Sequence, residues 1–202
     1  ALDLRLRRQL QLELKRIQQE VGITFVHVTH DQEEAMTMAD EIAVMNAGRI
    51  EQRGSATELY EQPATEFVAG FLGISNLIDA TLKRTDAGQA EYETHDGATV
   101  YASVAREGAV RVGVRPEKLS IVETPPEGGN VLRGRVEVAS FLGVSLQYLV
   151  RTPGGEELTV IEQNNRSAAH PRGGPVGPGQ EVLLSWRPEH TFVVTKEQQH
   201  GP

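Results

Sequence analysis

The residues best suited to chemistry lie in the run Val28–Ala35, which reads Val-Thr-His-Asp-Gln-Glu-Glu-Ala. The run Ile23–Thr29 is rich in β-branched residues and apolar on both faces, a pattern typical of a buried parallel strand. Because ligands of open α/β sheets bind at the carboxyl ends of the strands, we expect His30 to face a ligand. A neutral imidazole there can hydrogen-bond a phosphate oxygen or orient a water molecule. The alternative is a histidine that only completes the turn.

Helices are expected on both sides of this run. Apolar residues recur at three- and four-residue steps from Leu6 to Val21 and predict an amphipathic helix that Gly22 ends. Asp31 and Glu34 have the spacing of a capping box, so a second helix is predicted over 32–39. The remaining elements, in order, are a hairpin with strands at 41–45 and 49–53, a helix opened by a capping box of Ser55 and Glu58, and a helix over 64–72.

One strand buried on both faces needs neighbours in a sheet, and the first 72 residues supply too few. We therefore interpret this segment as the end of a larger α/β domain. The strand at Ile23–Val28 would expose apolar side chains and unpaired backbone groups unless another chain covers it. This predicts a dimer or larger species built on residues 1–72, or loose order there.

The composition changes near residue 76, since nine of the ten prolines follow it. We place a boundary at Gly73–Asn76, giving segments 1–76 and 77–202. Short alternating runs separated by turn residues then predict a barrel or sandwich. Val112–Ile121 matches Leu184–Val193, which indicates an internal duplication. The expected strands are 77–84, 90–94, 99–103, 110–114, 119–122, 132–141, 145–151, 157–161, 181–186 and 191–195.

The composition also excludes several classes of function. The 202 residues include no Cys, so disulfides and thiolate chemistry are excluded. Lys and Arg total 20 against 28 Asp and Glu, and the charge of −8 disfavours non-specific binding to nucleic acid or anionic lipid. No apolar run is long enough to span a membrane. The histidines lack the spacing of metal ligands, so no metal site is expected.

Several of these motifs resemble the ATP-binding subunits of ABC importers. Ala1-Leu-Asp3 resembles the D-loop, Thr29-His30-Asp31 followed by Glu-Glu-Ala resembles the H-loop, and the hairpin from Ile42 to Ser55 resembles the one that follows it. The Arg-Pro-Glu strands and the run Val136–Tyr148 resemble the TOBE regulatory domain, a small OB-like barrel. The junction Phe71–Ile78 resembles polyamine and ferric-iron importer subunits more than sugar importer subunits.

The resemblance implies an α/β fragment, the end of a P-loop NTPase-type domain, followed by an all-β OB-like barrel with an internal duplication. It implies that His30 contacts the γ-phosphate of ATP and that Asp3 lies at the nucleotide dimer interface. Both roles would orient rather than cleave. Glu33 and Glu34 are interpreted more simply, as acids favoured at a helix N-terminus by the macrodipole.

The sequence departs from the family in ways that matter for activity. It has no Gly-x-x-x-x-Gly-Lys-Ser/Thr run, no Leu-Ser-Gly-Gly-Gln signature and no acidic strand bearing the catalytic Glu. ATP and Mg²⁺ are therefore expected to be cofactors of a longer parent. In the fragment itself no cofactor is expected, and we predict neither tight ATP binding nor hydrolysis.

The implied partners are a second copy of the ATPase subunit, transmembrane permease subunits and an effector at the β region, with no nucleic acid. The implied location is cytoplasmic, peripheral on the inner face of the cell membrane. Two alternatives use the arginines near the strands: a small-oxyanion sensor and a single-stranded nucleic-acid binder. Acidic neighbours such as Glu117 and Glu189 favour a plainer account, an Arg-Glu contact inside each copy of the repeat.

Overall fold

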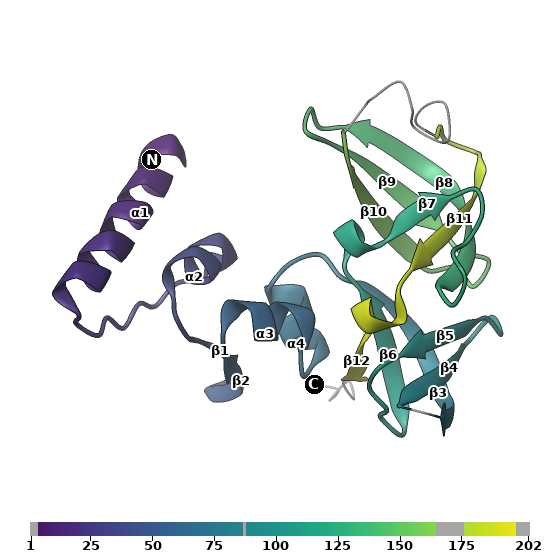
Figure 1. The fold of residues 1–202 in the computed structure, drawn as a ribbon, viewed down its shortest axis with the longest axis horizontal. Helices are drawn as coiled ribbons and strands as arrows, with labels where there is room; N and C mark the ends of the chain where they lie inside the picture. The colour runs from purple at the N-terminus through teal and green to yellow at the C-terminus, as the bar shows by residue number, and fades with distance from the viewer. Residues whose placement is uncertain (1–3, 87, 165–175, 197–202) are drawn as a thin grey trace.

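A computed structural model describes residues 4–86, 88–164 and 176–196. The helices lie towards one end of the molecule and two β-sheets at the other, with helix α1 farthest from the sheets (Figure 1). The helical end contains α1 (Leu4–Val21) and α2 (Gln32–Met38), followed by the hairpin of β1 (Ile42–Asn46) and β2 (Arg49–Gly54). Helices α3 (Ala56–Glu61) and α4 (Glu66–Phe71) then lead to the sheets.

Local capping sets the ends of these helices, as the sequence predicts. Gly22 ends α1 with a positive φ of 68° and donates its N–H to Gln18 O at 2.9 Å. Ser55 and Glu58 form the predicted capping box of α3 in full. Of the box predicted for α2, the Asp31 half is present, since Asp31 accepts from two backbone N–H groups, while the Glu34 carboxylate bonds Thr29 and Gln11. Helix α4 begins at residue 66, later than expected, because Thr65 is its N-cap and accepts from Val68 N.

The predicted buried strand at Ile23–Thr29 is wrong for the chain by itself. The segment has no strand pairing, and Val26 and Val28 are 90% and 91% exposed. A strand exists only through hydrogen bonds to a neighbour, and the described part of the chain places none beside this segment. The apolar pattern is real, but its burial requires atoms that this structure does not contain.

The region after residue 76 forms two five-stranded antiparallel sheets, and every strand expected there is present. The bounds are β3 (Asn76–Asp86), β4 (Gln89–Thr94), β5 (Thr99–Ala102), β6 (Ala109–Val114), β7 (Ser120–Val122), β8 (Asn130–Phe141), β9 (Ser145–Arg151), β10 (Glu157–Gln163), β11 (Glu181–Trp186) and β12 (Phe192–Thr195). One sheet has the order β12-β6-β3-β4-β5 and the other β7-β11-β8-β9-β10.

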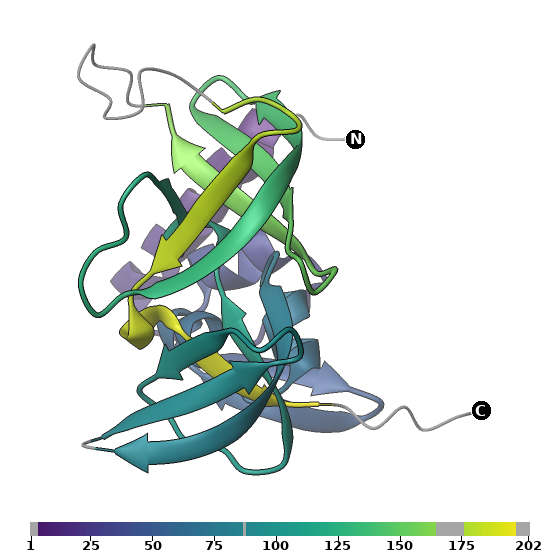
Figure 2. The same cartoon turned by 90° about the vertical axis from the view of Figure 1, so that its right-hand side faces the viewer.

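The two sheets have the same arrangement of strands, and each takes its last strand from the other copy of the repeat. The first copy runs from β3 to β7 and the second from β8 to β12. Each copy places a short 3₁₀ turn, Pro116–Lys118 or Pro188–His190, before its last strand. That strand joins the other copy's sheet: β7 pairs with β11, and β12 pairs with β6. Figure 2 shows the C-terminal segment passing from the upper sheet to the lower one.

Hydrogen bonds in matching positions confirm the duplication. The Asn76 side chain bonds both backbone groups of Thr159 in the second copy, at 2.8 and 2.7 Å. The Asn130 side chain bonds both backbone groups of Tyr101 in the first copy, at 2.9 and 2.7 Å. Each copy therefore clamps a strand of the other with a buried asparagine. One apolar core fills the space between the sheets and includes Tyr92 and Tyr148.

Arg115, from the first Arg-Pro-Glu turn, joins the helices to the sheets. Its side chain is 1% exposed and donates to Tyr60 O at 2.8 and 3.1 Å and to Ala69 O at 2.9 Å. These carbonyls lie in the last turns of α3 and α4, where a cation also complements the helix dipoles. The guanidinium stacks on the rings of Tyr60 and Phe192, 4.0 and 5.3 Å from their centroids.

Glu117 completes this joint in a way that differs from the expected Arg-Glu contact. It accepts a hydrogen bond from the Tyr60 hydroxyl at 2.8 Å instead of pairing with Arg115. Burial, together with this bond, raises the pKa of Tyr60 to about 12, so the hydroxyl remains a proton donor at neutral pH. In the second copy the expected contact is present, since Arg187 lies 3.5 Å from Glu189 at the surface. The division after residue 76 stays a prediction, because α3 and α4 pack directly on the β region.

Replacing Arg115 with Met is expected to lower the free energy of unfolding by about 2–4 kcal/mol, because buried carbonyls at two helix ends lose their donors. Urea denaturation followed by circular dichroism measures this. Arg187→Met is the matched control in the same motif, and its exposed ion pair predicts a change within about 0.5 kcal/mol. Equal losses in the two variants would contradict the structural role given to Arg115.

Candidate functional site

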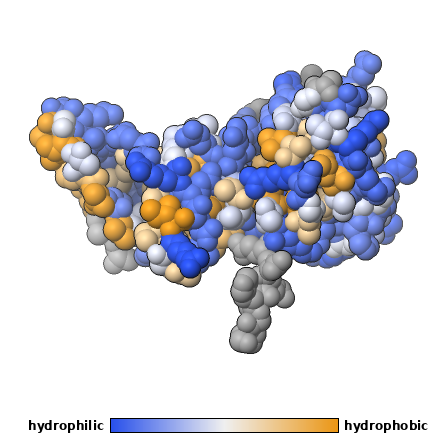
Figure 3. All heavy atoms as spheres, turned by 90° about the horizontal axis from the view of Figure 1, so that it is seen from below, coloured by the Kyte–Doolittle hydropathy of each residue, from blue (hydrophilic) through white to orange (hydrophobic). Residues whose placement is uncertain are grey.

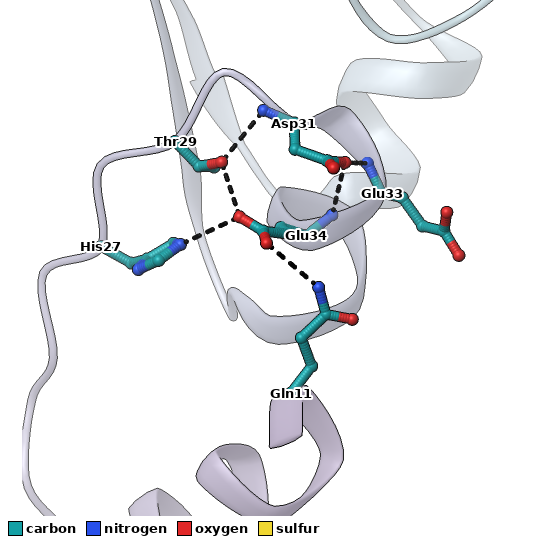
Figure 4. Close-up of polar contacts among 6 residues, drawn as sticks. All are labelled: Gln11, His27, Thr29, Asp31, Glu33 and Glu34. Carbon is teal, nitrogen blue, oxygen red and sulfur yellow. Dashed lines mark hydrogen bonds and ion pairs between the residues drawn. The ribbon is translucent and has the colours of Figure 1, made fainter. Parts of the chain in front are cut away.

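The turn at Thr29–Asp31 connects the extended segment to α2 and is closed by its own side chains (Figure 4). Asp31 Oδ1 accepts from Glu33 N at 2.9 Å and from Glu34 N at 3.2 Å. Thr29 Oγ1 accepts from Asp31 N at 2.9 Å. The backbone on both sides of His30 is therefore held by hydrogen bonds, as an Asp N-cap and a preceding Thr predict.

His30 is exposed in this turn. Its position just before a helix agrees with the sequence, although the strand expected before it is absent. Asp3, the other site residue expected, lies outside the described residues. The structure therefore does not bring these two residues together, and their roles remain predictions.

Glu34 makes contacts that the helix-dipole interpretation does not include. Its carboxylate accepts from Thr29 Oγ1 at 2.8 Å and from Gln11 Nε2 at 3.3 Å, and His27 Nε2 lies 3.5 Å away. These partners belong to the turn, to α1 and to the extended segment (Figure 4). Sequence reasoning missed Glu34 and Gln11 as a pair because they are distant along the chain and carry no shared motif.

Helix α1 meets α2 with polar groups. Besides Gln11, Lys15 donates to Met38 O at 2.9 Å and to Asp40 Oδ1 at 2.6 Å. The predicted apolar stripe of α1 is exposed instead, with side chains 40–59% accessible: Leu6, Leu10, Leu14, Ile17 and Val21. An amphipathic helix that turns its apolar face outward is arranged to contact a further protein surface.

The outward apolar side chains of α1 and those of the extended segment form what we call the α1 surface: Leu6, Leu10, Leu14, Ile17, Val21, Ile23, Phe25, Val26 and Val28. Figure 3 shows hydrophobic residues gathered at the left end of the molecule, where α1 lies. No helix among the described residues is long and apolar enough to cross a membrane. The same residues contain no group of three or more His, Cys, Asp or Glu side chains suited to a metal ion.

Known proteins are similar to this chain over both its helical part and its β region. The family model described as "TOBE domain" matches residues 112–194. The spermidine/putrescine import ATP-binding protein PotA of Thermobifida fusca is 45% identical over 96% of this chain and 50% of its own length. The corresponding protein of Acidothermus cellulolyticus is 47% identical over 95% of this chain and 50% of its own length. The chain is homologous to the C-terminal region of these import ATP-binding proteins.

The chain spans about half the length of the curated relatives it matches. The PotA protein of Mesorhizobium japonicum is 42% identical over 88% of this chain and 49% of its own length. Among solved structures, the cytoplasmic molybdate-binding protein ModG with molybdate bound has a TM-score of 0.50 at 15% identity, covering 60% of this chain and 96% of that one. This likeness supports the OB-like fold of the β region and carries no conclusion about its ligand.

The α1 surface predicts self-association of the isolated chain. The double variant Val26→Glu, Val28→Glu should shift the species towards monomer, because two charges would be buried in any contact made there. Sedimentation velocity over a concentration series measures the shift. Val104→Glu, at a 46% exposed apolar position of the β region, is the control that should leave the distribution unchanged. A wild-type chain that stays monomeric at all concentrations contradicts this prediction.

Proposed function

We propose that this chain acts as the C-terminal, regulatory half of the ATP-binding subunit of a polyamine importer. The observation that carries the proposal is its identity of about 45% to several spermidine/putrescine import ATP-binding proteins over nearly all of its residues. The relatedness includes the His30 turn and the duplicated β region alike. It favours importer function over the oxyanion-sensor and nucleic-acid alternatives.

The residues of this chain do not make a complete site for ATP and Mg²⁺. The sequence has no phosphate-binding Gly-Lys loop, which would supply the backbone N–H groups and the lysine that hold a triphosphate. We propose that the remaining length seen in the relatives supplies this cradle. His30 then contributes one contact to the γ-phosphate, held at an exposed turn, and Asp3 contributes to the interface between two nucleotide sites.

The α1 surface supports the same arrangement. Its apolar side chains have the composition of a domain interior, and Ile23–Val28 has the pattern of a strand buried on both faces. We propose that the nucleotide-binding part of the subunit covers this surface and pairs with that segment. The duplicated β region then remains free to contact a second copy of the subunit or an effector.

The wider assembly follows from the importer proposal. Permease subunits would carry the solute across the membrane, and the ATP-binding subunit would lie on its cytoplasmic face. Hydrolysis of ATP by the whole subunit would drive uptake. In this assembly the present chain supplies orientation and regulation rather than the bond-breaking groups.

A fusion tests the proposal directly. The N-terminal half of the Thermobifida fusca relative, joined to this chain, should restore spermidine uptake to cells that lack that relative. His30→Ala in the fusion should reduce ATP hydrolysis by about 10²-fold or more, the effect of losing an orienting contact to a transferring group. His95→Ala, an exposed histidine of the β region, is the matched control that should leave hydrolysis unchanged.

The chain alone gives a complementary prediction. Calorimetric titration with MgATP should show no saturable binding up to about 1 mM nucleotide, because the triphosphate cradle is missing. Circular dichroism of the same sample verifies that the β region is folded. A dissociation constant in the micromolar range would show that the chain holds nucleotide by groups not identified here.

A further inference from the structure

A chain of side-chain hydrogen bonds links α1 to the turn that carries His30. Gln11 Nε2 donates to Glu34 Oε1 at 3.3 Å, and Thr29 Oγ1 donates to Glu34 Oε2 at 2.8 Å. The Glu34 carboxylate thus has one oxygen on the helix and the other on the turn (Figure 4). This group therefore joins α1 to the turn, two elements that are distant in sequence.

Hydrogen bonds within the turn connect Glu34 to the residues on both sides of His30. Thr29 donates to Glu34 while its oxygen accepts from Asp31 N, and Asp31 in turn accepts from Glu34 N. The ring of bonds therefore begins and ends at Glu34 and encloses the backbone of His30. A displacement of Glu34 must move Thr29 and Asp31 together, and with them the residue between them.

On α1 the polar residue Gln11 is buried while apolar residues are exposed. Gln11 is 7% exposed, whereas the apolar residues of the same helix, such as Leu10 and Leu14, are each 48% exposed. A buried amide needs a hydrogen-bond partner, since losing it costs more than one exposed bond would contribute. The position of α1 is thus specified by polar contacts, with Gln11 and Glu34 at the turn and Lys15 at the end of α2, rather than by apolar packing.

We propose that Gln11, Glu34 and Thr29 form a positioning relay that transmits the position of α1 to His30. Helix α1 begins at Leu4, directly after Asp3, so the relay connects the segment proposed for the nucleotide interface with the histidine proposed for the γ-phosphate. The role of the relay in connecting two parts of a nucleotide site rests on the proposed function, but the hydrogen-bonded link between α1 and His30 does not. Glu34 and Thr29 are positioning residues that act through His30.

The test measures the NMR signals of His30 in the isolated full-length chain, without nucleotide. In Thr29→Val, which keeps the shape and removes the hydroxyl, the His30 amide and ring signals should shift. Amide exchange across 29–34 should rise at least about fivefold, the effect of losing the two hydrogen bonds of Thr29 Oγ1. Thr29→Ser keeps the hydroxyl and should restore both readouts. Gln11→Leu should shift the same His30 signals from the other end of the relay.

Matched controls separate a relay from general disturbance of the helices. Gln9→Leu changes an exposed glutamine of α1 and should leave His30 unchanged. Glu34→Ala should also shift the His30 signals, whereas Glu33→Ala should not, because the Glu33 side chain points away from Thr29 in Figure 4. Signals of the β region verify folding in every variant.

The outcomes decide the proposal one way or the other. Effects of Gln11→Leu that stop short of His30 would overturn the relay, as would equal effects of Gln9→Leu and Gln11→Leu or of Glu33→Ala and Glu34→Ala. The readout contains no nucleotide. A failed uptake experiment therefore counts against the importer proposal alone, and an unmoved His30 counts against the relay alone.

Discussion

One buried guanidinium holds the helical end and the β end of this molecule in a single arrangement. Arg115 lies at the end of a strand of the first sheet, and its bonds to the carbonyls of Tyr60 and Ala69 close the last turns of α3 and α4. Those helices in turn pack on the β1–β2 hairpin through Leu59 and Val68. Arg115 makes one of several contacts that orient the helices relative to the sheets, the others including Tyr60 with Glu117 and the cluster of Ala69, Phe192 and Val194. The joint is polar and directional, so it fixes an angle as well as a contact.

The duplicated turns show how one sequence motif serves two purposes. Both Arg-Pro-Glu triplets form the same 3₁₀ turn, since Pro sets the backbone angle at its start. Only the first has helix ends to bind, and only there does the exchanged strand place an aromatic ring, Phe192, beside the arginine. Gly113 leaves room for that ring, because a Cβ atom there would lie 2.1 Å from it. The second Arg-Pro-Glu turn has the same backbone, but Arg187 is exposed and makes none of the helix contacts of Arg115.

Features that depend on residues close in sequence could be predicted, and features that depend on distant residues could not. The alternation that marks each strand after residue 76, the caps at Asp31 and Ser55 and the end of α1 at Gly22 are set by residues a few positions apart, and all were predictable. The strand predicted at Ile23–Thr29 is absent, because its apolar pattern anticipates a sheet that the described residues lack. Arg115 and Glu34 were missed for a related reason. The hydrogen-bond partners of Arg115 are 40 to 55 positions away, and the same Arg-Pro-Glu triplet surrounds Arg187.

The exchange of β7 and β12 has a consequence for how the chain is completed during synthesis. The first sheet does not receive its edge strand until residues 192–195 have left the ribosome, long after the rest of that sheet has been made. The same late strand brings Phe192 to Arg115 and pairs Thr195 with Thr65 at the start of α4. The bonds of Arg115 to Tyr60 and Ala69 can form earlier in synthesis, whereas the contact with Phe192 and the Thr65–Thr195 bridge are added only when β12 is made. The joint is therefore completed in two stages, and the second stage waits for residues 192–195.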